Sequence, residues 1–167
     1  IRMIYAKEKA RRALLEEFRE KVLPKAASSE ELITKLIQPY TDAYLIAKRC
    51  QYVSTANAAQ VNALLKWLNR IDNSDWLPSA MKFLSDKGAD AEYVEWFFTK
   101  LERLAAYMHI CARDVNERIE RYAKVLSDLE LPHSLSHPVA SIELDANEKR
   151  AFQKALDEDI YNFTARR

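Results

Sequence analysis

The chain has 167 residues and a mass of 19.4 kDa, which is enough for one domain with its own hydrophobic core. Hydrophobic residues make up 49% of the chain and charged residues 31%, a balance that excludes a disordered or fibrous protein. Only one glycine is present, whereas hairpin turns, bulges and phosphate-binding loops depend on residues that tolerate positive φ. We therefore expect an all-α protein without a glycine-rich nucleotide site.

The charges are nearly balanced, with 26 Lys and Arg residues against 25 Asp and Glu residues. Proteins that bind nucleic acid through electrostatics are usually strongly basic, so the overall charge indicates no particular partner. The local excess of bases lies in residues 1–25, which hold eight Lys and Arg and four Glu. Because the two signs interleave, we interpret this segment as a solvated helix face; a phosphate-binding face that uses Arg11 and Arg12 is the alternative.

The two cysteines, Cys50 and Cys111, are too few for a disulfide scaffold and indicate packed thiols in a reducing compartment. The longest run without a formal charge, residues 50–65, contains six polar side chains and cannot span a bilayer. We therefore expect a cytoplasmic chain with no membrane partner. Because the chain begins at Ile1, we also expect it to be a segment of a longer polypeptide.

The first half of the chain contains three expected helices. Residues 5–23 have apolar side chains at helical spacing, and Pro24 is expected to end this helix. A second helix is expected over residues 28–52, with a kink or restart near Gln38 because Pro39 cannot donate a backbone hydrogen bond. The third helix is expected over residues 57–71. The apolar residues of the first helix are Leu14, Leu15, Phe18 and Val22.

The second half begins with a short helix over residues 76–88, which Gly88 is expected to end in the left-handed conformation. The strongest apolar pattern follows Asp90 and predicts a central helix packed on two sides. Its inward residues are predicted to be Tyr93, Val94, Phe97, Phe98, Leu101, Leu104, Ala105 and Met108. Asp114 with Glu117 predicts a capping box at the start of the next helix.

Residues 131–144 contain two prolines and no helical pattern, so we expect a loop there. The loop divides a main bundle, residues 1–130, from C-terminal helices, residues 145–167. Asp145 with Glu148 predicts a second capping box after it. The sequence therefore predicts a single domain over residues 1–167, an irregular bundle of six to eight helices.

No catalytic or metal-binding constellation stands out in the sequence. His133 and His137 have the spacing of zinc ligands, but the cysteines occur singly and no Cys-x-x-Cys is present. We expect no cofactor, no metal and no catalytic residue in this segment. The aromatic residues could stack on nucleobases, but their helical spacing favours core packing, with Trp76 and Tyr107 as the expected exceptions.

The second half also carries a Trp-x-Pro motif, a Phe-Phe pair and a Leu-Glu-Arg-Leu run. The residues concerned are Trp76, Pro78, Phe97, Phe98, Leu101, Glu102, Arg103, Leu104, Tyr107 and Met108. This pattern resembles the helical middle region of GmrSD-type modification-dependent restriction endonucleases. The tail is similar to the approach to that family's nuclease domain, through Leu144, Phe152, Leu156, Ile160, Tyr161, Arg166 and Arg167. The resemblance covers residues 64–167.

Such proteins are bacterial and combine a ParB-like nucleotide-hydrolysing domain with a His-Asn-His nuclease that cuts modified foreign DNA. Neither catalytic motif occurs in these residues, so the resemblance implies a non-catalytic connecting domain within a nucleotide-dependent endonuclease. Its implied partners are the two flanking domains. Glu102 and Arg103 are then either a packed charge pair, the favoured interpretation, or an interdomain contact.

Two alternatives remain open at this point. The first is a DNA-binding module that uses the basic N-terminal segment together with Arg166 and Arg167. Such binding would depend strongly on salt concentration. The second is an independent protein-interaction domain that has no link to restriction.

Overall fold

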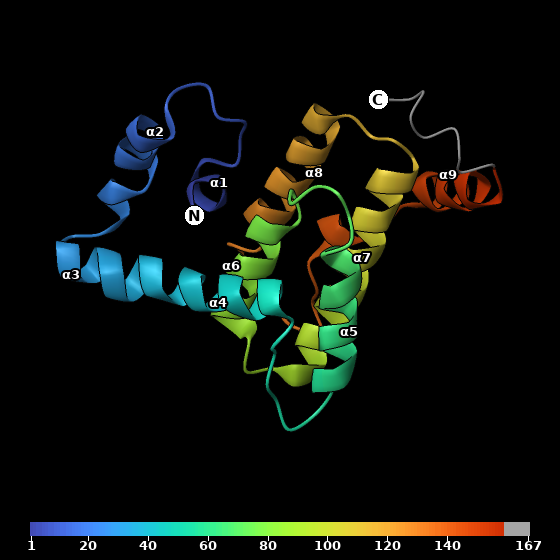
Figure 1. Ribbon diagram of the computed structural model, residues 1–167, viewed down its shortest axis with the longest axis horizontal. Coiled ribbons are helices and arrows are strands. Elements are labelled where there is room, and N and C mark those ends of the chain that lie inside the picture. Colours follow the sequence, from blue (N-terminus) through green and yellow to red (C-terminus); the bar gives the residue numbers. More distant parts are fainter. Residues whose placement is uncertain (159–167) are drawn as a thin grey trace.

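The computed structural model describes residues 1–158, and these residues form helices and no β-strand (Figure 1). The prediction of an all-α bundle is therefore confirmed. The α-helices are α1 (Arg2–Ala6), α2 (Leu14–Lys21), α3 (Ser29–Glu31), α4 (Gln38–Arg49), α5 (Ala58–Leu68), α6 (Leu77–Lys87), α7 (Ala91–Ile110), α8 (Val115–Asp128) and α9 (Ala146–Asp157). Short 3-10 turns lie at Leu23–Lys25 and Ala140–Ile142, and Leu32–Ile37 is π-helical.

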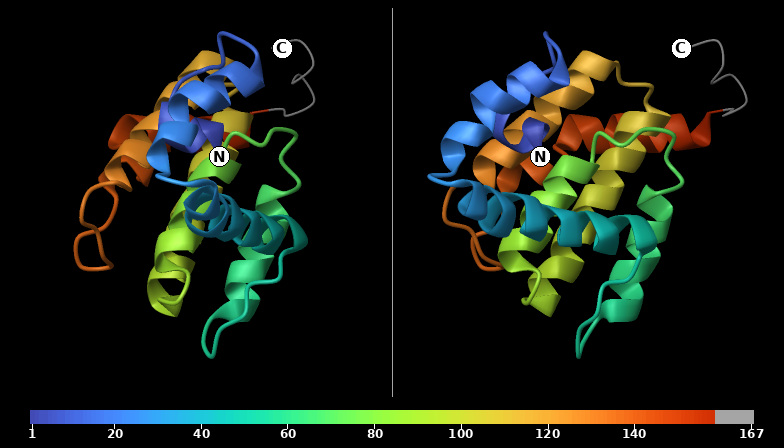
Figure 2. Two further views of the ribbon diagram at one scale, coloured as in Figure 1. Left: turned by 90° about the vertical axis from the view of Figure 1, so that its left-hand side faces the viewer. Right: turned by 60° about the vertical axis from the view of Figure 1, so that its left-hand side comes forward.

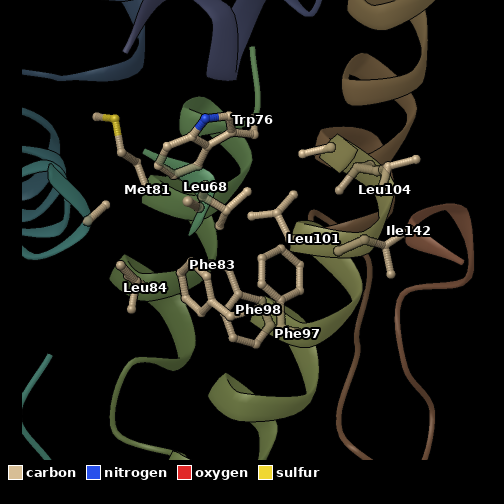
Figure 3. Close-up of a cluster of buried hydrophobic side chains, with 14 of the residues drawn as sticks. Leu68, Trp76, Met81, Phe83, Leu84, Phe97, Phe98, Leu101, Leu104 and Ile142 are labelled. Atoms are coloured by element: carbon tan, nitrogen blue, oxygen red, sulfur yellow. The ribbon is translucent and has the colours of Figure 1, made fainter. Parts of the chain in front are cut away.

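Helix α7 is the centre of the bundle and packs against α5, α6 and α9. All eight residues predicted to face inward on this helix are buried, so the prediction of a central helix is confirmed. Figure 3 shows α6 and α7 side chains meeting in the core, where the rings of Phe83 and Phe97 stack with centroids 3.8 Å apart. Burial of such large apolar side chains is the main source of stability in a bundle of this size.

The second part of the loop over residues 131–144 packs back onto the bundle, whereas residues 134–138 are exposed. Val139, Ile142 and Leu144 belong to the same core cluster as α6 and α7. At the other end of the loop, the Tyr93 hydroxyl lies 2.9 Å from Nδ1 of His133. Residues on both sides of the loop therefore share one hydrophobic core.

Helix α3, the π-helical segment and α4 form one long rod that lies across α6 at a steep angle (Figures 1 and 2). The hydrogen-bonding pattern changes at Gln38, whose N–H donates to the carbonyl of Ile33, five residues back. Pro39 follows directly and has no N–H to offer. The expected restart near Gln38 is thus present as a change from π-helical to α-helical bonding.

The predicted single helix over residues 5–23 is wrong. The chain forms α1, leaves the helical conformation at Lys7 with a φ of 52°, and reverses before α2 begins at Leu14. Within the reversal, the backbone N–H groups of Arg11 and Arg12 donate to the Glu17 carboxylate instead of to a preceding helical turn. The break in the expected helix is therefore stabilised by hydrogen bonds to the Glu17 side chain, which the helical spacing of the apolar residues does not reveal.

The predicted left-handed conformation of Gly88 is also wrong, since its φ is −57° at the end of α6. A Cβ at this position would lie 2.4 Å from the carbonyl oxygen of Leu84, so the close approach of backbone favours glycine. The Gly88 carbonyl in turn accepts a hydrogen bond of 2.8 Å from the Tyr52 hydroxyl. Left-handed helix ends occur instead at Lys7, which closes α1, and at Cys50, which closes α4 with a φ of 53°.

No helix in residues 1–158 has the length and apolar character needed to cross a membrane. Helix α7, with its 20 residues, carries charged side chains at intervals along its outer face.

Candidate functional site

The N-terminal arm, residues 14–37, contributes little to the core of the fold. It comprises α2, the turn Leu23–Lys25, α3 and the π-helical segment. In Figure 1, α2 and α3 lie at one edge of the molecule, on the side opposite α9. The arm packs mainly against its chain neighbours α1 and α4.

Apolar side chains of the arm remain in solvent. Leu14 is 68% exposed, Leu15 61% and Ile33 54%. None of residues 14–37 belongs to the core cluster, and only Glu17 and Val22 of the arm are buried. Leu14 and Leu15 belong to the apolar residues at helical spacing in the expected first helix, but α2 starts only at Leu14 and leaves both side chains exposed. Leu14 and Leu15 are adjacent in the sequence and expose two apolar side chains at the start of α2.

A polar anchor fixes the arm to the body. Arg2 on α1 donates through Nε to the Glu17 carboxylate on α2, and the side chains are only 13% and 5% exposed. The other Glu17 oxygen accepts the N–H groups of Arg11 at 2.7 Å and Arg12 at 2.9 Å. The Arg2 guanidinium also donates to two carbonyls of the reversal, those of Glu8 and Lys9. One buried ion pair therefore organises the whole reversal between α1 and α2.

Hydrogen bonds keep the Glu17 carboxyl ionised. The backbone N–H of Arg11 has the largest effect in lowering its pKa, and the N–H of Arg12 and the Arg2 side chain lower it further, while burial acts in the opposite direction. The net direction is downward. The anchor therefore persists through the neutral range and weakens only in acid.

Arg11 and Arg12, the candidate DNA contacts, lie on the outside of this reversal and are exposed. Arg12 forms an ion pair with Glu20, and Arg11 lies 3.3 Å from the carboxylate of Glu8. Acidic neighbours thus partly neutralise the charges of Arg11 and Arg12. A DNA contact at these two residues stays a prediction. The other two candidates, Arg166 and Arg167, lie outside the described residues.

Most residues of the Trp-x-Pro and Leu-Glu-Arg-Leu motifs are core residues. Trp76, Phe97, Leu101 and Tyr107 are each 2% exposed or less (Figure 3 shows the first three). The expectation that Trp76 and Tyr107 would be exceptions to core packing is therefore wrong. Pro78 lies half-buried in the first turn of α6.

The exposed tryptophan is Trp67, which is 55% exposed on α5 and lies under the Arg70 guanidinium, 4.3 Å from the ring centroid. The buried Tyr107 hydroxyl accepts a hydrogen bond of 2.6 Å from Arg113. The sequence pattern alone could not show which of these aromatic residues are buried and which are exposed, because each of them falls at helical spacing among apolar neighbours.

Glu102 and Arg103 do not form the predicted packed pair. Arg103 is exposed, Glu102 is half-buried, and no salt bridge joins their side chains. Burial raises the pKa of the Glu102 carboxyl, and the charge of Arg103 opposes that rise. Adjacent helix positions point in directions about 100° apart, which is why neighbours in sequence are not neighbours in packing.

The two loop histidines have different surroundings. His133 lies against Phe83 and Tyr93, whereas the His137 backbone closes a turn with Ser134 through two hydrogen bonds of 3.1 Å. Within residues 1–158, no group of three His, Cys, Asp or Glu side chains could hold a metal ion. Cys50 and Cys111 are free half-buried thiols, and burial raises the pKa of Cys111, which makes it a poor nucleophile at neutral pH.

Comparison of the chain with models of protein families, with curated proteins and with solved structures finds no match. The resemblance to GmrSD-type restriction endonucleases therefore stays a prediction.

Proposed function

We propose that this chain is a helical connecting domain of a GmrSD-like bacterial restriction nuclease. In that role it couples a ParB-like nucleotide-hydrolysing domain to a His-Asn-His nuclease domain in the cytoplasm. The proposal is supported by the motifs of residues 64–167 and, above all, by the N-terminal arm, whose Leu14 and Leu15 are 68% and 61% exposed. Contact surfaces between domains of one chain cover about 600–1,500 Å² and commonly contain such apolar groups.

The arm is suited to transmit movement because of how it is attached. Its apolar residues lie outside the core cluster, so a neighbouring domain can bind them without opening the core. The Arg2–Glu17 pair ties α2 to α1, and α1 packs against α6 and α8. A displacement of α2 is thus passed through the Arg2–Glu17 pair and α1 to helices around the core, which is a way of coupling two sites.

The first test is the coding sequence on both sides of this chain. The proposal requires an Asp-Gly-Gln-Gln-Arg-type motif of the ParB-like domain upstream and a His-Asn-His motif downstream. Flanking sequence without either motif contradicts the proposal and favours an independent protein-interaction domain.

The second test uses the longer protein with Leu14→Asp and Leu15→Asp combined. We expect the stimulation of DNA cleavage by nucleotide to be smaller by about tenfold or more in this variant than in the wild type. The reason is that two charges cannot be buried at an apolar contact. The matched control is Val53→Asp, which places the same charge at a valine that is 88% exposed and outside the arm. A double variant that retains full nucleotide dependence contradicts the role given to the arm.

A further inference from the structure

A small pocket lies where α7, the end of the 131–144 loop and α9 meet. Its volume is about 50 Å³, and it is lined by Lys100, Arg103, Ile142, Glu143, Leu144 and Lys149. Lys100 and Arg103 come from one face of α7, and Lys149 comes from the first turns of α9. Ile142 and Leu144 are buried, so the pocket has an apolar floor beneath a charged rim.

The rim carries more positive than negative charge. The single carboxylate of the lining, that of Glu143, is held by the Lys100 ammonium at 2.6 Å. Lys100 also lies 5.6 Å from the centre of the Trp96 ring, which fixes its position further. These contacts neutralise Glu143, so that among the lining residues Arg103 and Lys149 remain as the positive charges.

Arg103 and Lys149 are not held in an ion pair within residues 1–158, although the charge of Arg103 acts on the neighbouring half-buried carboxyl of Glu102. Their side chains form no salt bridge and no hydrogen bond with residues 1–158. Arg121, by contrast, is bound to Glu148 of α9 at 2.9 Å. Two cations that line one pocket and form no salt bridge create a local field that attracts an anion.

The size of the pocket limits the anion. One water molecule needs about 10–15 Å³ measured in this way, so about 50 Å³ holds three to five oxygen atoms. That is the size of a single tetrahedral oxyanion. The planar fork of an arginine together with a lysine ammonium is a common donor set for phosphate oxygens.

We propose that this pocket binds a phosphate group, with Arg103 and Lys149 as its direct ligands. Lys100 acts as a positioning residue, because its contact with Glu143 withdraws the only carboxylate of the lining from the bound anion. The phosphate group is either free or part of a nucleic acid backbone. The site depends on neither of the proposed flanking domains, so it can be tested on this chain.

The test is a titration of the ¹⁵N-labelled chain with inorganic phosphate at constant ionic strength, followed by NMR. We expect saturable shifts of the backbone amides of Ile142, Glu143 and Leu144 in the millimolar range. Arg103→Gln and Lys149→Gln are each expected to weaken binding about tenfold. The matched control is Lys66→Gln, which removes an exposed lysine of α5 outside the pocket.

A second arm of the experiment separates the two sources of phosphate. If a nucleic acid backbone is the ligand, a short DNA duplex binds more tightly than inorganic phosphate, the affinity falls steeply with salt, and Arg103→Gln weakens it. If free phosphate is the ligand, the duplex causes no shift at residues 142–144 and inorganic phosphate still does. The proposal is overturned by the absence of saturable shifts up to about 50 mM phosphate, or by equal affinity of the wild type and both pocket variants.

Discussion

Arg2 and Glu17 are 15 residues apart in sequence and form a buried ion pair that holds α1 and α2 together. Each partner has further hydrogen bonds: the carboxylate accepts two backbone N–H groups, and the guanidinium donates to two backbone carbonyls. Buried charges are tolerated only when they are satisfied in this way. The pair therefore determines where the first helix ends and how the exposed leucines of the arm are presented.

Replacement of Glu17 by Gln is expected to release this reversal. The amide keeps the shape of the side chain but leaves the Arg2 charge buried without its counterion. The backbone amides of Arg11 and Arg12 should then exchange with solvent about tenfold faster or more, as measured by hydrogen exchange with NMR. Glu16→Gln is the control because Glu16 is exposed on the same helix. Unchanged exchange at both amides in the Glu17 variant contradicts the anchor.

Truncation of Phe97 should cost far more stability than truncation of Trp67, although tryptophan is the larger residue. Phe97 is fully buried and stacks on Phe83 at 3.8 Å, so Phe97→Ala leaves a cavity and is expected to cost about 3–5 kcal/mol. Trp67 is 55% exposed, and Trp67→Ala is expected to cost about 1 kcal/mol or less. Urea unfolding of both variants measures the difference. Similar losses for the two would contradict the assignment of α7 as the centre of the core.

His133 should make the protein less stable in mild acid. Burial lowers the pKa of its imidazole, and the charge of Lys87 lowers it further. Because the unfolded chain then binds more protons than the folded one below the usual histidine pKa of about 6.5, stability is lost as the pH falls through this value. The Tyr93 hydroxyl lies 2.9 Å from Nδ1 of the His133 ring and helps to hold the ring in place.

The measurement for His133 is the free energy of unfolding at about pH 7.5 and pH 5.5. His133→Gln is expected to reduce the difference between the two values. His137→Gln, at an exposed histidine of the same loop, is expected to leave it as in the wild type. If the His137 variant removed the pH dependence and the His133 variant did not, the assignment to the buried ring would be wrong.

The capping box of α8 offers a test of local stabilisation. The Asp114 carboxylate accepts the N–H groups of Asn116 at 2.7 Å and Glu117 at 3.1 Å. Asp114→Ala removes the oxygen that accepts both hydrogen bonds and is expected to cost about 1 kcal/mol in thermal or urea unfolding. Asp114→Ser keeps an acceptor at the same place and should recover most of the loss. A serine variant as unstable as the alanine variant would argue against the capping role.

Features that depend on a few consecutive residues could be predicted from the sequence. The capping boxes at Asp114 and Asp145 and the inward stripe of α7 are present as expected, because caps and helical periodicity arise from residues within about one turn of each other. The single glycine correctly indicated that residues 1–158 form no sheet. Its own conformation was predicted wrongly, because a close approach to Leu84, not a left-handed φ, favours glycine there.

The candidate surfaces could not be predicted in the same way. The basic pocket combines Arg103 with Lys149, which are far apart in the sequence and meet only because α9 packs against α7. The exposed leucines of α2 have the same helical spacing as core residues, so spacing alone does not show whether they are buried. The Arg2–Glu17 pair holds α2 on α1 in an arrangement that leaves these leucines in solvent.

The amino-acid sequence by itself therefore determined that the chain is helical, where α7, α8 and α9 begin, and which face of α7 is buried. The tertiary structure alone decided that the N-terminal helix breaks, that Trp76 is buried while Trp67 is exposed, and which cations share a pocket. The physical reason is the range of the interactions. Helix formation and capping act between near neighbours, whereas burial and ion pairing depend on residues that only the folded chain brings together.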